Sequence, residues 1–286
     1  MERPAMLASG ILGISVDVFR RVLGAGAGAV VTKSLSREPW EGYSNPTITG
    51  TGGGGWLNAV GLSNPGASAF AGMLKGQGLP AVVSLVGSAP AEFVSMIKEF
   101  RDGAAAFEIN LSCPHVAKVG LEVGDDPGLV GEIVSAAKRA ADVPVFAKVG
   151  LGSTHYIKTA GAAAEAGADA ITAINTVRAM SIDVEAKKPV LSNGFGGLSG
   201  PPIRPIAVRC VWELASKYDV PVIGCGGVSS WEDAIEMMLA GACAVQVGSA
   251  AGGRIGIFGE INAGILGYME RNGFGSVKEM VGLART

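Results

Sequence analysis

The residues whose side chains could do chemistry stand at the ends of short apolar runs. Lys33, Asn110, Lys148 and Asn175 each close such a run, and Cys113 follows shortly after one of them. A lysine at the end of an apolar strand is unfavourable unless it is paired or useful. Two lysines, two asparagines and a cysteine at one place would form a strong candidate site. Other polar residues at run ends, among them Ser9, Ser84 and Cys225, fit equally well as ordinary strand termini.

Cys113 is the most informative single residue. It lies in the segment Asn-Leu-Ser-Cys-Pro-His that begins at Asn110 and ends at His115. A thiol with a pKa of about 8.5 can act as a general base when it is mildly activated. A nucleophilic thiol, which would need a histidine and an orienting partner, stays open. Cys210 and Cys243 are expected to be buried as small hydrophobic residues.

Three glycine clusters in the last third of the chain suggest a phosphate site. They cover residues 196–200, 224–227 and 247–249. Glycines before helix N-termini leave backbone N–H groups free to bind an anion, and barrels bind phosphate after their last strands. The glycines of a further match, Gly-x-Gly-x-x-Gly at residues 50–55, follow no clear buried strand, and we interpret them as a glycine-rich loop.

The elements that would position these residues alternate in type along the chain. Helix-compatible stretches separate short apolar runs, which indicates parallel β/α units. Since most of the runs are continuously apolar, we expect strands buried on both faces. Eight of them favour a (β/α)8 TIM barrel over a doubly wound open sheet. The expected strands are residues 6–9, 30–33, 81–87, 107–112, 144–150, 170–175, 220–226 and 244–248, and the clearest helices are residues 91–102, 129–141, 156–165, 206–218 and 231–239.

Three segments are too long for simple turns after strands. Residues 34–67, 113–127 and 176–205 all follow the carboxyl ends of expected strands, which is the active-site face of a barrel. Long loops in a compact domain are usually functional. The chain length of 286 residues suits one barrel, so we expect a single domain over residues 1–286.

Composition narrows the function classes. The net charge is −2 and no block of basic residues occurs, so nucleic-acid binding is not expected. The 4 cysteines form no CxxC pair, which predicts neither a metal site nor a self-contained iron–sulfur cluster. A reducing cytoplasm is the simplest location. No stretch reaches the roughly 18 apolar residues of a membrane helix, so no membrane partner is expected.

Taken together, these motifs resemble the class 1 dihydroorotate dehydrogenases, and among them type 1B. The resemblance runs through the whole chain in the order of the family. Its most specific parts are Gly-Gly-Leu-Ser-Gly-Pro at residues 196–201 and Asn-x-Ser-Cys-Pro at residues 110–114. Further matching segments are residues 5–10, 31–34, 58–66, 144–149, 175–176, 188–191, 226–227 and 248–249.

The resemblance implies a barrel with FMN at its carboxyl-terminal mouth. Cys113 matches the base that removes a proton from C5 of dihydroorotate while hydride passes from C6 to flavin N5. Lys148 matches the lysine that stabilises negative charge on the reduced flavin. The implied flavin-binding residues are Ser9, Lys33, Ser34, Asn110, Lys148, Ser199, Gly200, Gly226, Gly227, Gly248 and Ser249. The implied substrate-binding residues are Lys33, Asn58, Gly61, Leu62, Asn110, Asn175 and Thr176.

The family also implies a homodimer, or a heterotetramer with a subunit that carries FAD and an iron–sulfur cluster and passes electrons to NAD. A stand-alone enzyme with a soluble acceptor such as fumarate fits the sequence as well. His115 stands where the family often has asparagine, which favours a dihydropyrimidine dehydrogenase of the same fold as an alternative. A non-redox phosphate-binding barrel with Lys148 or Lys33 as a Schiff-base lysine, and a non-catalytic metabolite-binding subunit, are further alternatives.

Overall fold

A closed barrel of eight parallel strands forms the centre of the molecule. The computed structural model describes residues 3–112, 123–152 and 156–285. The strand order around the barrel is β1-β14-β13-β8-β7-β6-β5-β2, which confirms the predicted (β/α)8 barrel and excludes the open sheet. The barrel strands are β1 (Ala5–Leu7), β2 (Val30–Val31), β5 (Ala81–Leu85), β6 (Ala106–Asn110), β7 (Val145–Val149), β8 (Ala170–Ala173), β13 (Val222–Cys225) and β14 (Ala242–Val247).

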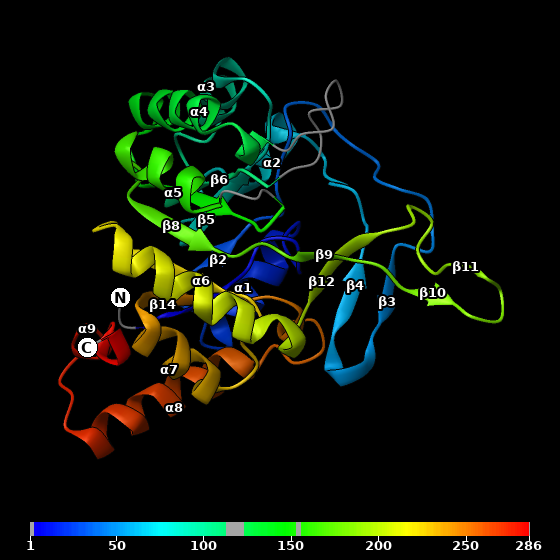
Figure 1. The fold of residues 1–286 in the computed structure, drawn as a ribbon. Helices are drawn as coiled ribbons and strands as arrows, with labels where there is room; N and C mark the ends of the chain where they lie inside the picture. The colour runs from blue at the N-terminus through cyan, green and yellow to red at the C-terminus, as the bar shows by residue number, and fades with distance from the viewer. Residues whose placement is uncertain (1–2, 113–122, 153–155, 286) are drawn as a thin grey trace.

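Helices surround the barrel (Figure 1). They are α1 (Val16–Gly24), α2 (Ala67–Leu74), α3 (Pro90–Glu99), α4 (Pro127–Ala140), α5 (Tyr156–Glu165), α6 (Arg204–Lys217), α7 (Trp231–Ala240), α8 (Ile257–Asn272) and the short α9 (Val277–Met280). Their starts are set locally: the Asp126 carboxylate accepts from two N–H groups of the first turn of α4, and Ser230 with Asp233 forms a capping box on α7. No helix in the described part of the chain is both long enough and apolar enough to cross a bilayer.

The alternation of side chains along the strands decides what lies inside the barrel. On β7, Val145, Ala147 and Val149 join the large apolar core between strands and helices. Phe146 and Lys148, on the opposite face, point into the barrel. Because both faces of every strand are covered, the strand sequences are mostly apolar, and a polar residue on the inner face is therefore easy to recognise.

A second, four-stranded sheet lies outside the barrel. This sheet was not predicted from the sequence. It is antiparallel, with the order β3-β4-β12-β9, and comprises β3 (Ile48–Gly50), β4 (Trp56–Asn58), β12 (Gly196–Ser199) and β9 (Val177–Ala179). A two-stranded ribbon, β10 (Ile182–Asp183) with β11 (Lys188–Pro189), extends from it. Figure 1 shows this sheet and ribbon projecting on the side away from the two chain ends. Two of the long segments, 34–67 and 176–205, therefore carry structure of their own after β2 and β8.

The second sheet explains the glycines at residues 50–55. Gly50 ends β3, and a 3₁₀ turn over Gly52–Gly54 leads into β4, so the glycines form a hairpin connection. This agrees with their interpretation as a loop. Gly196 and Gly197 lie in the middle strand of the sheet, β12, where an added Cβ would collide with Asn58 and Thr176, respectively. These two glycines therefore allow close strand packing and do not form part of a phosphate loop.

Candidate active site

The floor of the barrel is apolar and its upper part is polar. The floor is built by inward residues near the starts of the strands, among them Met6, Phe146, Ala170, Ile223 and Ala244. Two residues further along several strands, the inward positions change to polar side chains: Ser84, Glu108, Lys148, Thr172 and Gln246, all buried. Since a strand rises about 3.3 Å per residue, these groups form a layer one step closer to the carboxyl-terminal mouth.

A buried ion pair occupies this polar layer. Lys148 Nζ lies 3.6 Å from Glu108 Oε1, and the two residues are 4% and 0% exposed. Lys148 also donates a 3.0 Å hydrogen bond to Gln246 Oε1. Glu108 Oε2 accepts hydrogen bonds from Gln246 Nε2 at 2.6 Å and Thr172 Oγ1 at 3.0 Å. The two charged residues and their two hydrogen-bonding neighbours thus come from four strands, β6, β7, β8 and β14.

Electrostatics keep Lys148 charged despite its burial. Desolvation by itself would lower the pKa of Lys148, but the adjacent Glu108 carboxylate outweighs it and raises the pKa above its ordinary value. Burial raises the pKa of Cys225, so this thiol is neutral at pH 7. A fixed cation just below the mouth can stabilise negative charge that develops above it.

A row of small polar side chains crosses the mouth directly above this layer. Asn110 Nδ2 donates to Ser34 Oγ at 3.1 Å, and Asn175 Nδ2 reaches Asn110 Oδ1 at 3.3 Å. Ser34 Oγ lies 2.9 Å from Ser84 Oγ and 3.4 Å from Ser9 Oγ. Five residues that are far apart in the sequence are therefore connected. Ser9, Ser34, Asn110 and Asn175, all predicted site residues, meet as the barrel closure requires.

Lys33 follows β2 at the same end of the barrel. Its backbone N–H donates to the carbonyl of Gly13 at 2.8 Å, which ties the loop after β1 to the end of β2. Burial lowers the pKa of Lys33. An anion bound next to Lys33 would therefore be favourable, because it would stabilise the charged form that burial disfavours.

The predicted substrate residues of the outer segments belong to the second sheet and its connections. Asn58, on β4, donates from Nδ2 to the carbonyl of Gly197 at 3.1 Å. Thr176 directly follows Asn175, and its N–H donates to Asn175 Oδ1 at 2.8 Å. Gly61 has a φ of 71°, and an added Cβ would lie 2.6 Å from the ring of Tyr43. Leu62 follows with a φ of 45°, and its carbonyl accepts from Asn64 Nδ2 at 2.7 Å.

The turns after β12, β13 and β14 form a glycine-lined cradle. Gly227 has a φ of 76°, and an added Cβ would lie 2.8 Å from the backbone of Arg204, the first residue of α6. Gly200, which follows Ser199 at the end of β12, has a φ of 89°, and an added Cβ would lie 2.9 Å from Gly54 O and 3.6 Å from Ser249 Oγ. Gly226 and Gly248 stand at the ends of the neighbouring strands β13 and β14. The turn after β13 thus lies against the start of α6, and free N–H groups at a helix N-terminus are suited to bind a phosphate group.

The donor set and the cradle together fit a flavin mononucleotide. Amide and hydroxyl groups line the mouth, a buried ammonium lies below it, and the glycine turns stand beside it. The remaining predicted residues, Cys113 and His115, lie outside the described residues. The described part of the chain contains no group of three or more histidine, cysteine or acidic side chains placed to hold a metal ion.

Sequence reasoning missed the polar layer below the mouth. Glu108, Thr172 and Gln246 were not singled out, although Glu108 and Gln246 are lone polar residues within the apolar strands Ala106–Asn110 and Ala242–Val247. The argument applied to Lys148 would have found both. What the sequence could not show is that they contact one another.

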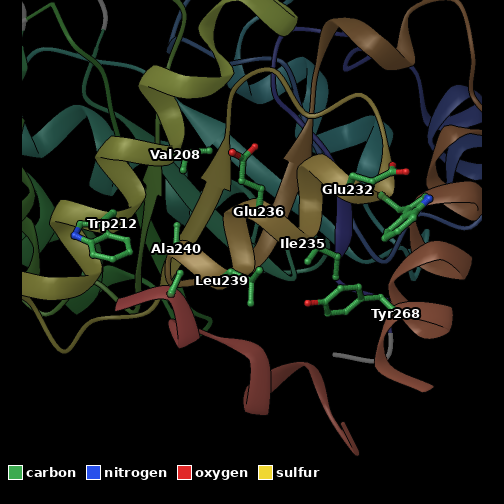
Figure 2. Close-up of a pocket in the computed structure, with 10 residues that line it drawn as sticks. Val208, Trp212, Glu232, Ile235, Glu236, Leu239, Ala240 and Tyr268 are labelled. Carbon is green, nitrogen blue, oxygen red and sulfur yellow. The ribbon is translucent and has the colours of Figure 1, made fainter. Parts of the chain in front are cut away.

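A separate groove of about 490 Å³ lies on the outer surface of the barrel. Figure 2 shows its walls, formed by side chains of α6, α7 and α8 such as Trp212, Leu239 and Tyr268. None of its lining residues belongs to the mouth. This groove is therefore distinct from the candidate active site.

Comparison with known proteins agrees with the fold and with the predicted resemblance. The pattern of the family described as dihydroorotate dehydrogenase matches residues 1–269. The chain is 47% identical to a protein of Pyrococcus furiosus over 287 residues, which is 99% of this chain and 95% of the relative. It is 47% identical to a Thermococcus kodakarensis protein and 44% identical to one from Methanocella arvoryzae, each over 99% of this chain and 94% of the relative.

All three relatives carry the name dihydroorotate dehydrogenase B (NAD(+)), catalytic subunit. The alternatives of a non-redox barrel and of a non-catalytic binding subunit are wrong, because the family consists of flavin-dependent oxidoreductases. With its closed barrel, its polar mouth and full-length matches of this identity, the chain belongs to the dihydroorotate dehydrogenase family, class 1B.

Proposed function

We propose that the protein oxidises dihydroorotate to orotate, a step of pyrimidine biosynthesis, with FMN bound at the mouth of the barrel. The observation that carries this proposal is the stack of two layers in a member of this family. Ser34, Asn110 and Asn175 form a hydrogen-bonded row at the strand ends, and the buried Lys148 is the register partner of Asn110 on the adjacent strand. A planar cofactor and a planar substrate both need such a row of amides and hydroxyls.

Residues from the ends of seven strands would hold the cofactor. Lys148 would stand below the isoalloxazine ring as a fixed cation, and the glycine cradle would take the phosphate. The other residues proposed to contact FMN are Ser9, Lys33, Ser34, Asn110, Ser199, Gly200, Gly226, Gly227, Gly248 and Ser249. When bound, FMN supplies the acceptor for the hydride that leaves C6 of the substrate.

The substrate carries a carboxylate and ring amides, and the proposed contacts match both. The Lys33 ammonium would bind the carboxylate, which offsets the burial that lowers the pKa of Lys33. The amides of Asn110 and Asn175 offer donors and acceptors to the ring. Asn58, Gly61, Leu62 and Thr176 would complete the pocket from the second sheet and its connections.

The proposed base is Cys113. Its thiolate would accept the proton from C5, and the electron pair of that C–H bond would form the C5–C6 double bond as hydride departs from C6. The proton on the sulfur would then return to solvent before the next turnover. A base with a pKa near the working pH is the efficient choice for this transfer.

We further propose that electrons leave through a partner subunit with FAD and an iron–sulfur cluster. The relatives are named as catalytic subunits of NAD-linked enzymes. The protein would act in the cytoplasm as a homodimer or as part of a heterotetramer. On this proposal the isolated chain reduces an artificial dye but not NAD, and NAD reduction appears only with the partner. Rapid NAD reduction by the isolated chain would refute this route.

Turnover of two substrates tests the main proposal against its closest alternative. Dye reduction should proceed with dihydroorotate and be at least a hundredfold slower with dihydrouracil, which lacks the carboxylate that Lys33 would bind. Compared at equal FMN occupancy, the Lys33→Met variant should lose a larger share of its activity with dihydroorotate than with dihydrouracil. The reverse preference in the unmodified protein would indicate a dihydropyrimidine dehydrogenase, in line with His115. Flavin released by denaturation should be FMN and not FAD.

A further inference from the structure

One oxygen atom of the buried Glu108 carboxylate, Oε1, makes no hydrogen bond within the described residues and faces Lys148. Glu108 Oε2 has two hydrogen-bond donors, but Oε1 is buried and has no hydrogen-bond partner among the described residues. The closest cation is Lys148 Nζ, at 3.6 Å. A fully buried carboxylate that keeps a bare oxygen is unfavourable unless the adjacent charge compensates it.

Glu108 lies deeper along β6 than Asn110, which belongs to the hydrogen-bonded row at the mouth. Asn110 pairs with Lys148 across β6 and β7, and Glu108 pairs with Phe146. Glu108 and Lys148 are therefore two residues apart in register on adjacent strands. Gln246 connects the two, because its amide accepts from Lys148 and donates to Glu108.

We infer that Glu108 is a positioning residue, which holds the Lys148 ammonium charged and in place and thereby sets how strongly the site favours reduced flavin. Gln246 fixes the distance between the two charges. In this proposal Glu108 acts through Lys148 and is not assigned a contact with the substrate or the flavin. The inference rests on the proposed function for the presence of flavin, but the ion pair itself does not.

Among the described residues, the titratable groups that face Lys148 come from two strands. Glu108 lies on β6, and Cys225 lies on β13. The neighbouring strand β8 contributes the neutral Thr172, and β14 contributes the neutral Gln246. Without Glu108, the Lys148 ammonium would keep the full desolvation of its site and lose its main compensating charge. Its titration should then move down into an accessible pH range.

The first test is the midpoint potential of the purified protein with FMN, measured between pH 6 and pH 9.5. In the unmodified protein, a plot of the midpoint potential against pH should show no change of slope caused by Lys148 in this range. In Glu108→Gln, a change of slope should appear where Lys148 loses its proton. Above that pH the preference for reduced flavin should fall at least tenfold, which is about 30 mV for a two-electron couple. Thr172→Val, which removes one donor to Glu108 but no charge, should keep the unmodified profile. Glu108→Asp should restore it.

The second test is a double-mutant cycle on unfolding, with the measured FMN affinities used to subtract the stabilisation by ligand. Glu108→Gln and Lys148→Gln should each destabilise the protein. The double variant should be more stable than additivity predicts, by at least tenfold in the unfolding constant, which is about 1.4 kcal/mol. Should Glu108→Gln fail to fold, folding of the double variant supports the inference. Failure of both indicates a general packing role and overturns it.

The two tests separate this inference from the proposed function. The role of Glu108 is overturned, while flavin binding is unaffected, if two results occur together. The midpoint potential of Glu108→Gln would have the same pH dependence as that of the unmodified protein, and the destabilisations in the double-mutant cycle would be additive. Absence of flavin from the unmodified protein overturns the proposed function, and the cycle still decides whether the two charges are coupled.

Discussion

Gly227→Ala tests the glycine cradle, and its effect can be worked out from the structure. The φ of 76° at Gly227 costs an L-residue about 1–2 kcal/mol. The added Cβ would also lie 2.6 Å from Arg204 Cβ and 2.8 Å from the Arg204 backbone. Arg204 cannot move freely, because its guanidinium pairs with Asp233 and, at 3.1 Å, with Glu236. Overpacking of this kind adds about 1–3 kcal/mol.

We therefore expect Gly227→Ala to destabilise the protein by about 2–5 kcal/mol. Gly76 provides a matched control, since its φ is 71° and an added Cβ would have no atom within 4 Å. Gly76→Ala should lose only the backbone part, about 1–2 kcal/mol. Denaturant unfolding of both variants gives the two values, and their difference measures the collision with α6.

The same pair of variants tests the phosphate assignment. FMN affinity, measured by fluorescence titration of the flavin, should fall at least tenfold in Gly227→Ala and stay unchanged in Gly76→Ala. Equal stability of the two variants would refute the packing argument. Unchanged FMN affinity in a destabilised Gly227→Ala protein would refute the cradle as the phosphate site.

Three further predictions concern single side chains. Lys148→Ala should weaken FMN binding and lower the flavin potential by at least 30 mV, roughly tenfold in the two-electron equilibrium, and a normal potential would disprove its role. Cys113→Ser should retain FMN but lose most of the flavin reduction by dihydroorotate, most severely near neutral pH, and rates equal to the unmodified protein at every pH would reject Cys113 as the base. Burial would raise the pKa of Asp169, but Lys138 and the Val145 N–H outweigh it and lower that pKa. The interaction stabilises the folded protein by less than about 1 kcal/mol, because the pair is partly exposed. This stabilisation is present above the pKa that Asp169 has in the unfolded chain, and it is lost as the pH falls through the pKa in the folded protein. Unfolding of Asp169→Asn should therefore differ from that of the unmodified protein at pH 7 and converge with it at acidic pH, once the carboxyl is protonated in both the folded and the unfolded state, and a constant difference would contradict the assignment.

The barrel was predictable because its strands are buried on both faces. Runs such as Ala81–Leu85 and Val145–Val149 are apolar apart from one inward polar residue each, and each is followed by a helix. The mouth residues followed from the same pattern, since polar groups at the carboxyl ends of parallel strands must meet once the barrel closes. Ser34, Asn110 and Asn175 meet for this reason.

The second sheet could not be predicted from local pattern. β3 is partly or fully exposed along its length, and β12 begins with two glycines, so neither resembles a buried strand. The pairing of β4 with β12 joins segments more than a hundred residues apart. The contacts of Glu108 were equally hidden, because they depend on the register of β6, β7 and β14 and not on any spacing along the chain.

An anaerobic absorption spectrum of the purified chain, recorded before and after addition of dihydroorotate, tests the central claim most directly. The account predicts flavin bands that bleach when dihydroorotate is added, since the substrate would then reduce FMN at the mouth of the barrel. Flavin bands that persist with dihydroorotate and bleach with dihydrouracil would contradict the proposed substrate. A chain that shows no flavin bands, even after FMN is supplied, would contradict the assignment of the mouth as a flavin site.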